Sequence, residues 1–180
     1  MSKTVVFYKS RYGVTKKYVQ YLKEELSCDM MAIEDANVVS LAKYNAIVFG
    51  GGVYAGAIAG FSFIKKNFDK LKDKKLIVFA VGASEANEDT IEEIRKRHFT
   101  GDLSDIPFYY CRGAWDEELL SLPHKLLIRV IKRLVSNKKR EETDNNLGSL
   151  SDTMGAKADW TDKSYLEPII QQLREVEDEF

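Results

Sequence analysis

The residues whose types most clearly suggest a binding site lie between an apolar segment at residues 4–8 and a helical pattern that begins near residue 15. They are Ser10, Arg11, Tyr12, Gly13, Val14 and Thr15. A turn that leads into a helix N-terminus directs backbone N–H groups and the positive end of the helix dipole toward one point. Ser10 and Thr15 add hydroxyl groups, and Gly13 permits a close approach or a positive φ. This donor set predicts a site for a phosphate monoester.

Two common phosphate motifs are excluded. The turn has one glycine and no lysine before Thr15, so it is not a P-loop, and no Gly-x-Gly-x-x-Gly dinucleotide motif is present. An ordinary strand-to-helix turn with a Ser or Thr cap stays open as the alternative.

Two further loops follow apolar strands. The first carries four glycines and one aromatic residue between Gly50 and Gly56, and its candidate binding residues are Gly51, Gly52, Val53, Tyr54, Ala55 and Gly56. Glycines at a strand end indicate backbone that approaches another group closely. The second loop is small and polar, with Gly82, Ala83 and Ser84 as candidates. A flexible hinge with a core tyrosine and a plain strand-to-helix turn are the respective alternatives.

Apolar strand patterns alternate with helical patterns along the chain. We expect strands at 4–8, 30–33, 44–50, 75–81 and 106–111, and helices from about 15 and at 58–71, 87–97 and 161–176. This alternation predicts an α/β fold with a doubly wound parallel sheet. Ligands of such sheets bind at the carboxyl ends of the strands, where the strand order reverses. The three loops should therefore meet at one site.

The composition is that of an ordinary globular protein, with 180 residues, 44% hydrophobic residues and a net charge of -1. We expect one domain over residues 1–180. Cys28 and Cys111 are far apart and should be buried free thiols. Without Cys or His clusters we expect no metal site. The sequence starts without a signal-peptide pattern and has no apolar run long enough to cross a bilayer, so we expect a cytoplasmic protein.

A long insert at about 113–158 separates the fifth strand from the last helix. Residues 123–135 predict an amphipathic helix, and residues 119–140 contain seven Lys or Arg and no acidic residue. Such a helix suits peripheral contact with the inner face of a membrane or with an acidic partner. A helix packed on the domain with a solvated basic face is the alternative. We expect no nucleic-acid binding, because interleaved aromatic residues are missing.

The pattern Ser-x-x-Gly-x-Thr after an N-terminal strand resembles the phosphate loop of the flavodoxin family, and residues 44–57 resemble its second flavin loop. The resemblance implies a flavodoxin-like five-stranded sheet of order 2-1-3-4-5 with helices on both faces. It also implies FMN, with its phosphate at Ser10–Thr15 and its ring between the later loops, where Tyr54 would pack on it. The third loop has no aromatic residue through Thr90, so one ring face would be open or covered by Trp115.

Two later regions, residues 107–116 and 126–133 followed by Asp159-Trp160, resemble the flavodoxin-type protoporphyrinogen oxidases. That resemblance implies an FMN oxidoreductase with a small-molecule redox substrate and a quinone acceptor. The chain departs from this branch at Gly113-Ala114-Trp115. A soluble electron-transfer flavodoxin and a flavin-binding module without turnover are the alternatives. No catalytic residue is identified, although Tyr54, Glu85 and Trp115 are the nearest candidates.

Overall fold

A central parallel sheet confirms the predicted fold class. The computed structural model describes residues 3–36, 38–120, 122–137 and 157–178. The five parallel strands, in their order across the sheet, are β2 (Cys28–Ala32), β1 (Thr4–Lys9), β3 (Ala46–Tyr54), β5 (Lys75–Gly82) and β6 (Phe108–Arg112). Val6 of β1 is aligned with Met30 on one side and with Val48 on the other. Because β5 and β6 are the fourth and fifth parallel strands along the chain, this is the predicted 2-1-3-4-5 order. The strand order reverses between β1 and β3.

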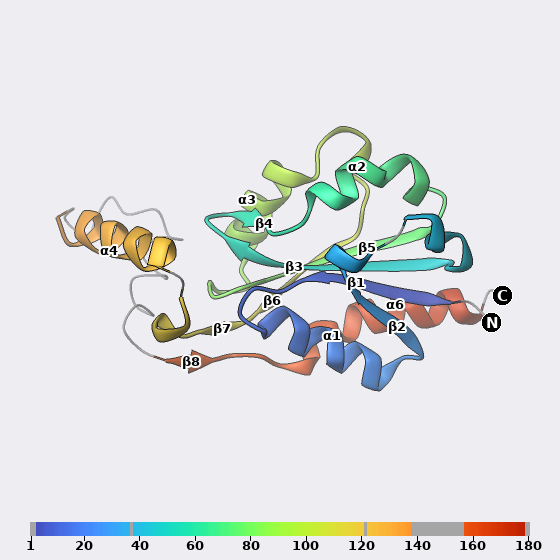
Figure 1. Ribbon diagram of the computed structural model, residues 1–180, viewed down its shortest axis with the longest axis horizontal. Helices are drawn as coiled ribbons and strands as arrows, with labels where there is room; N and C mark the ends of the chain where they lie inside the picture. Colours follow the sequence, from blue (N-terminus) through green and yellow to red (C-terminus); the bar gives the residue numbers. More distant parts are fainter. Residues whose placement is uncertain (1–2, 37, 121, 138–156, 179–180) are drawn as a thin grey trace.

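Helices cover both faces of the sheet (Figure 1). One face carries α1 (Val14–Glu25) and α6 (Glu167–Asp178), and the other carries α2 (Ser62–Leu71) and α3 (Glu88–His98). Side chains of a strand alternate between the two faces, so each strand supplies both cores. Val5 and Phe7 belong to the core under α2 and α3, whereas Val6 belongs to the core under α1 and α6.

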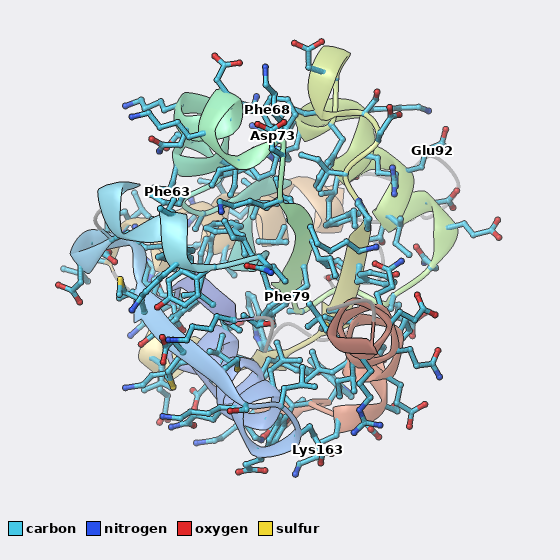
Figure 2. The ribbon with its side chains drawn as sticks, turned by 90° about the vertical axis from the view of Figure 1, so that its right-hand side faces the viewer. Phe63, Phe68, Asp73, Phe79, Glu92 and Lys163 are labelled. Atoms are coloured by element: carbon cyan, nitrogen blue, oxygen red, sulfur yellow. The ribbon has the colours of Figure 1, made fainter. Side chains whose placement is uncertain are left out.

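Phe79 of β5 illustrates the packing. Its side chain is fully buried and lies in the interior of the molecule, whereas Glu92 and Lys163 lie at the periphery (Figure 2). Cys28 and Cys111 are both buried and unbridged, as predicted. Burial raises the pKa of the Cys111 thiol, which favours its neutral, unreactive form. These two cysteines therefore act as small core residues.

The prediction of a loop from Gly50 to Gly56 is wrong, because β3 continues as a strand to Tyr54. The short strand β4 (Ala57–Ile58) folds back and pairs antiparallel with Val53 and Tyr54. Ala55 and Gly56 form the two-residue turn with φ of 49° and 71°, the positive values that such a tight hairpin requires. Gly51 is buried inside the strand, where a Cβ would lie 2.5 Å from Ile58 Cγ2. Close packing, rather than flexibility, therefore explains the glycines.

Several predicted boundaries shift. The predicted strand at 30–33 is Cys28–Ala32, and the helix expected from residue 58 begins at Ser62 because β4 occupies its first residues. The last helix is preceded by a 3-10 turn, η5 (Lys163–Leu166), which Asp162 caps by accepting a hydrogen bond from Ser164 N at 2.8 Å. The other 3-10 segments are η1 (Ile33–Asp35), η2 (Val38–Lys43), η3 (Gly101–Leu103) and η4 (Glu117–Leu119).

The insert after β6 begins as a ribbon. β7 (Ala114–Trp115) pairs antiparallel with β8 (Ala158–Asp159), and between them the chain forms η4 and α4 (Leu122–Asn137). The helix predicted at 123–135 is confirmed, and in Figure 1 it stands away from the sheet, beyond the carboxyl ends of the strands. Residues 138–156 of the predicted insert lie outside the described residues. In the described part of the chain, no helix has the length and apolar character needed to span a membrane.

Candidate functional site

A cleft opens at the carboxyl ends of β1, β3 and β5, where the sheet order reverses. It encloses about 700 Å³, a figure that includes space open to solvent. The first of its two walls, here called the sheet wall, consists of Ser10, Tyr12, Val14, Thr15, Gly52, Val53, Tyr54, Val81, Gly82 and Ala83. The second, called the ribbon wall, consists of Gly113, Ala114, Trp115, Asp116, Leu119 and Leu120.

The predicted phosphate turn forms one end of the sheet wall. Gly13 is the N-cap of α1 with a φ of 86°, and nothing lies within 4 Å of the position of a Cβ there. Ser10 Oγ accepts a hydrogen bond from Lys16 N at 3.3 Å, which fixes the turn against the helix. Thr15 is buried although it lines the cleft. The first helical turn carries no acidic residue that would repel an anion. These features fit the phosphate of a mononucleotide.

Nine of the predicted binding residues line the cleft and six do not. Those outside the lining are Arg11, Gly13, Gly51, Ala55, Gly56 and Ser84. Ala55 and Gly56 belong to the hairpin turn, where Ala55 O accepts a hydrogen bond from Arg97 Nη1 at 2.8 Å. Ser84 O accepts one from the Tyr110 hydroxyl at 3.1 Å.

His124, the third residue of α4, contacts both the phosphate turn and the end of β3. Its Nδ1 lies 2.6 Å from the Tyr12 hydroxyl, and its Nε2 lies 3.1 Å from Arg11 Nη1. Its ring stacks on Tyr54 with a centroid distance of 5.5 Å and an interplanar angle of 12°. No local sequence pattern predicts this position of His124, because Tyr12 lies 112 positions away in the chain.

The charge of Arg11 fixes the arrangement of protons in this cluster. An arginine in a protein stays protonated and can only donate, so Nε2 of a neutral His124 must accept its hydrogen bond. The His124 proton then resides on Nδ1 and is donated to the Tyr12 hydroxyl oxygen. Burial raises the pKa of the Tyr54 hydroxyl, which keeps this ring neutral beside the cleft. A neutral aromatic surface suits a flat ligand ring.

The ribbon wall is held against the third loop. Gly113 N donates a hydrogen bond to Gly82 O at 2.7 Å, and Trp160 N donates one to Gly113 O at 3.0 Å. A Cβ at Gly113 would lie 2.8 Å from Val81 Cγ1, so only glycine permits this approach. Most of this wall escaped the sequence prediction, although residues 113–116 lay within a segment singled out by resemblance.

Asp116 is the charged residue of the ribbon wall. Its side chain is largely covered, and Oδ2 lies 2.8 Å from Lys157 Nζ while Oδ1 accepts a hydrogen bond from Glu118 N at 2.9 Å. The hydrogen bond from Lys157 lowers the pKa of this carboxyl. Asp116 and Lys157 therefore form an ion pair at one edge of the cleft.

The fold and the site together define an α/β mononucleotide-binding protein. The family model described as "Flavodoxin domain" matches residues 5–144, and the chain belongs to this family. FMN is accordingly its cofactor, and the phosphate turn and the neutral Tyr54 ring fit it. When bound, FMN supplies one- and two-electron redox chemistry, whereas the chain supplies the binding groups.

Three solved flavodoxins are similar to this chain at low sequence identity. A flavodoxin from the domain Archaea is 16% identical over 65% of this chain and 88% of its own, with a TM-score of 0.41. Oxidised Flavodoxin 2 from Bacillus cereus is 18% identical over 66% and 90%, with a TM-score of 0.40. Two-electron reduced Megasphaera elsdenii flavodoxin is 16% identical over 59% and 82%, with a TM-score of 0.42. A comparison with curated proteins gave no match.

Proposed function

We propose that this chain transfers electrons through FMN bound in the cleft. The observation that carries the proposal is the position of Thr15 at the N-terminus of α1. This residue is buried and lines the cleft that Tyr54 also lines. A phosphate held at this helix end would leave the flavin ring to lie between the two walls, near the surface. Membership in the flavodoxin domain family supports a redox function without naming a partner.

Anaerobic reduction of the FMN-loaded protein, followed by mixing with one acceptor at a time, tests this function. We expect the protein to purify yellow and the reduced form to be reoxidised by a protein acceptor under anaerobic conditions. A protein that stays colourless with added FMN would contradict the proposal. So would a reduced form that only oxygen reoxidises.

A second candidate is a two-electron oxidoreductase similar to the flavodoxin-type protoporphyrinogen oxidases, with a quinone acceptor. The apolar ribbon-wall residues Trp115, Leu119 and Leu120 favour it, because they would border the flavin where a flat apolar substrate could enter. The comparisons support the flavodoxin domain and do not reach this branch. Anaerobic incubation with protoporphyrinogen and a quinone would distinguish the two functions. Formation of fluorescent porphyrin that requires the quinone would support the oxidoreductase, and no porphyrin formation would support the electron carrier.

We also propose that α4 contacts the cytoplasmic face of an anionic membrane. Leu122 and Leu126 are 81% and 63% exposed, and Arg129 and Arg133 are exposed on the same helix. Exposed apolar side chains beside cations match the boundary between acyl chains and anionic headgroups. A quinone acceptor dissolved in that membrane would then lie near the cleft.

Vesicle sedimentation tests the membrane contact. The protein should sediment with vesicles that contain phosphatidylglycerol and not with pure phosphatidylcholine, and Lys125→Gln with Arg129→Gln should reduce the bound fraction. Lys65→Gln with Lys66→Gln on α2 is the matched control for net charge. Equal losses in both variants would contradict a specific role for α4.

A further inference from the structure

Trp115 has a buried polar atom without a partner. Its side chain is 9% exposed and lines the cleft, yet its indole Nε1 makes no hydrogen bond within the described part of the chain. Arg112 Nε and Gln172 Oε1 share this condition, but neither residue lines the cleft. Buried polar groups are almost always paired, and an indole N–H can only donate. An acceptor on a ligand in the cleft would satisfy this group.

The ribbon holds the indole in this position. Trp115 is aligned with Ala158 of β8, and the residue two positions before it, Gly113, is bonded to both Gly82 and Trp160. Gly113 also packs closely against Val81. These contacts fix the backbone at Trp115, and the indole itself is held by its burial in the wall of the cleft.

The surroundings of the indole specify the chemistry of the acceptor. Its neighbours in the cleft wall include Val81, Leu119 and Leu120, which favour a flat apolar body. Asp116, the next residue, is paired with Lys157 and adds no positive charge that would attract a phosphate. The phosphate turn already lies at the other wall of the cleft. A neutral carbonyl oxygen on an aromatic ring meets these conditions, and the isoalloxazine ring of FMN carries such oxygens.

We propose that Trp115 is an FMN-binding residue whose indole N–H donates a hydrogen bond to a carbonyl oxygen of the isoalloxazine. The proposal rests on FMN binding alone and is independent of the electron acceptor. The ribbon wall then contributes directly to flavin binding, at the edge of the ring that carries the acceptor oxygen.

Nuclear magnetic resonance of indole-¹⁵N-labelled protein tests the hydrogen bond directly. The chain has two tryptophans, so two indole N–H signals are expected, and Trp115→Phe identifies one of them by its loss. Saturating FMN should move the Trp115 signal downfield and slow its exchange with water. Riboflavin should produce the same change, because the acceptor is on the ring. A Trp115 signal that FMN leaves unmoved, or that inorganic phosphate alone moves equally, would overturn the proposal.

Binding measurements supply a second test with a matched control. Trp115→Phe keeps an aromatic ring but removes the donor, so affinity should fall about 3- to 10-fold for FMN and riboflavin alike. The flavin carbonyl stretch in the Raman spectrum should rise in frequency. Trp160→Phe, whose side chain stacks on Arg112 outside the cleft lining, should bind FMN within about twofold of the parent. Unchanged affinity and an unchanged carbonyl stretch in Trp115→Phe would overturn the proposal. If this variant does not fold, Trp160→Phe assigns the Trp115 indole signal as the one that remains, and the spectra with FMN decide.

Discussion

The two walls of the cleft differ in origin. The sheet wall grows from the ends of buried parallel strands, and its shape follows from the strand order of the fold. The ribbon wall comes from an insert that pairs with a distant segment, through β7 and β8. The sheet wall carries the helix end and the hydroxyls that suit a phosphate, whereas the ribbon wall carries apolar side chains, one acid and one unpaired indole donor. From this difference we expect the common fold to bind the phosphate and, through Tyr54, one side of the ring, and the insert to border the rest of the ring.

We expect the largest effect from a substitution in the phosphate turn, which should weaken the binding of FMN but not of riboflavin. Thr15→Val removes a buried hydroxyl at the phosphate turn while keeping the side-chain volume. Hydrogen bonds to charged groups contribute about 1.5–3 kcal/mol, so FMN affinity should fall about 10- to 100-fold. Riboflavin affinity, measured by fluorescence quenching, should change little, and Thr15→Ser should restore most of the FMN binding. Equal losses for both ligands would place the phosphate elsewhere.

A smaller effect is expected where the insert meets the sheet wall. His124→Ala removes the ring that stacks on Tyr54 and the hydrogen bond to Tyr12. The two contacts order Tyr54 for the flavin, so FMN and riboflavin affinity should each fall by about 3- to 10-fold. Leu126→Ala, an exposed change on the same helix, is the control. Loss of FMN affinity alone would instead assign His124 to the phosphate site.

The smallest effect concerns the anchor of the ribbon to α1. Asp159 has a pKa lowered to about 2, first by hydrogen bonds from the Thr161 hydroxyl and amide and then by Lys17, which lies 2.9 Å away. Because the folded pKa lies below the unfolded value of about 4, this interaction stabilises the protein above about pH 4 and is lost as the pH falls toward 2.

Thermal unfolding of Asp159→Asn measures this contribution. The parent should be more stable than the variant at pH 6 by no more than about 1 kcal/mol, since the ion pair is half-exposed. The difference should shrink as the pH is lowered from about 4 to about 2. A difference that does not depend on pH would mean that the carboxylate charge has no part in the anchor.

Sequence patterns predicted the sheet wall better than the ribbon wall. Doubly buried strands such as residues 46–49 and 76–81 have an unambiguous apolar pattern, and the loops that follow them converge by topology. The glycines at 50–52 were misleading because a glycine required by packing under Phe79 and a glycine in a flexible loop are identical in sequence. Two contacts had no local pattern in the sequence, because they depend on tertiary packing between distant segments. They are the hydrogen bond from Gly113 to Gly82 and the stacking of His124 on Tyr54.

A crystal structure of the protein with FMN tests the central claim most directly. The account predicts the phosphate at the N-terminus of α1, within hydrogen-bond distance of the Thr15 hydroxyl, and the flavin ring between Tyr54 and Trp115. A phosphate bound away from residues 10–15, or a ring lying outside the two walls, would contradict it.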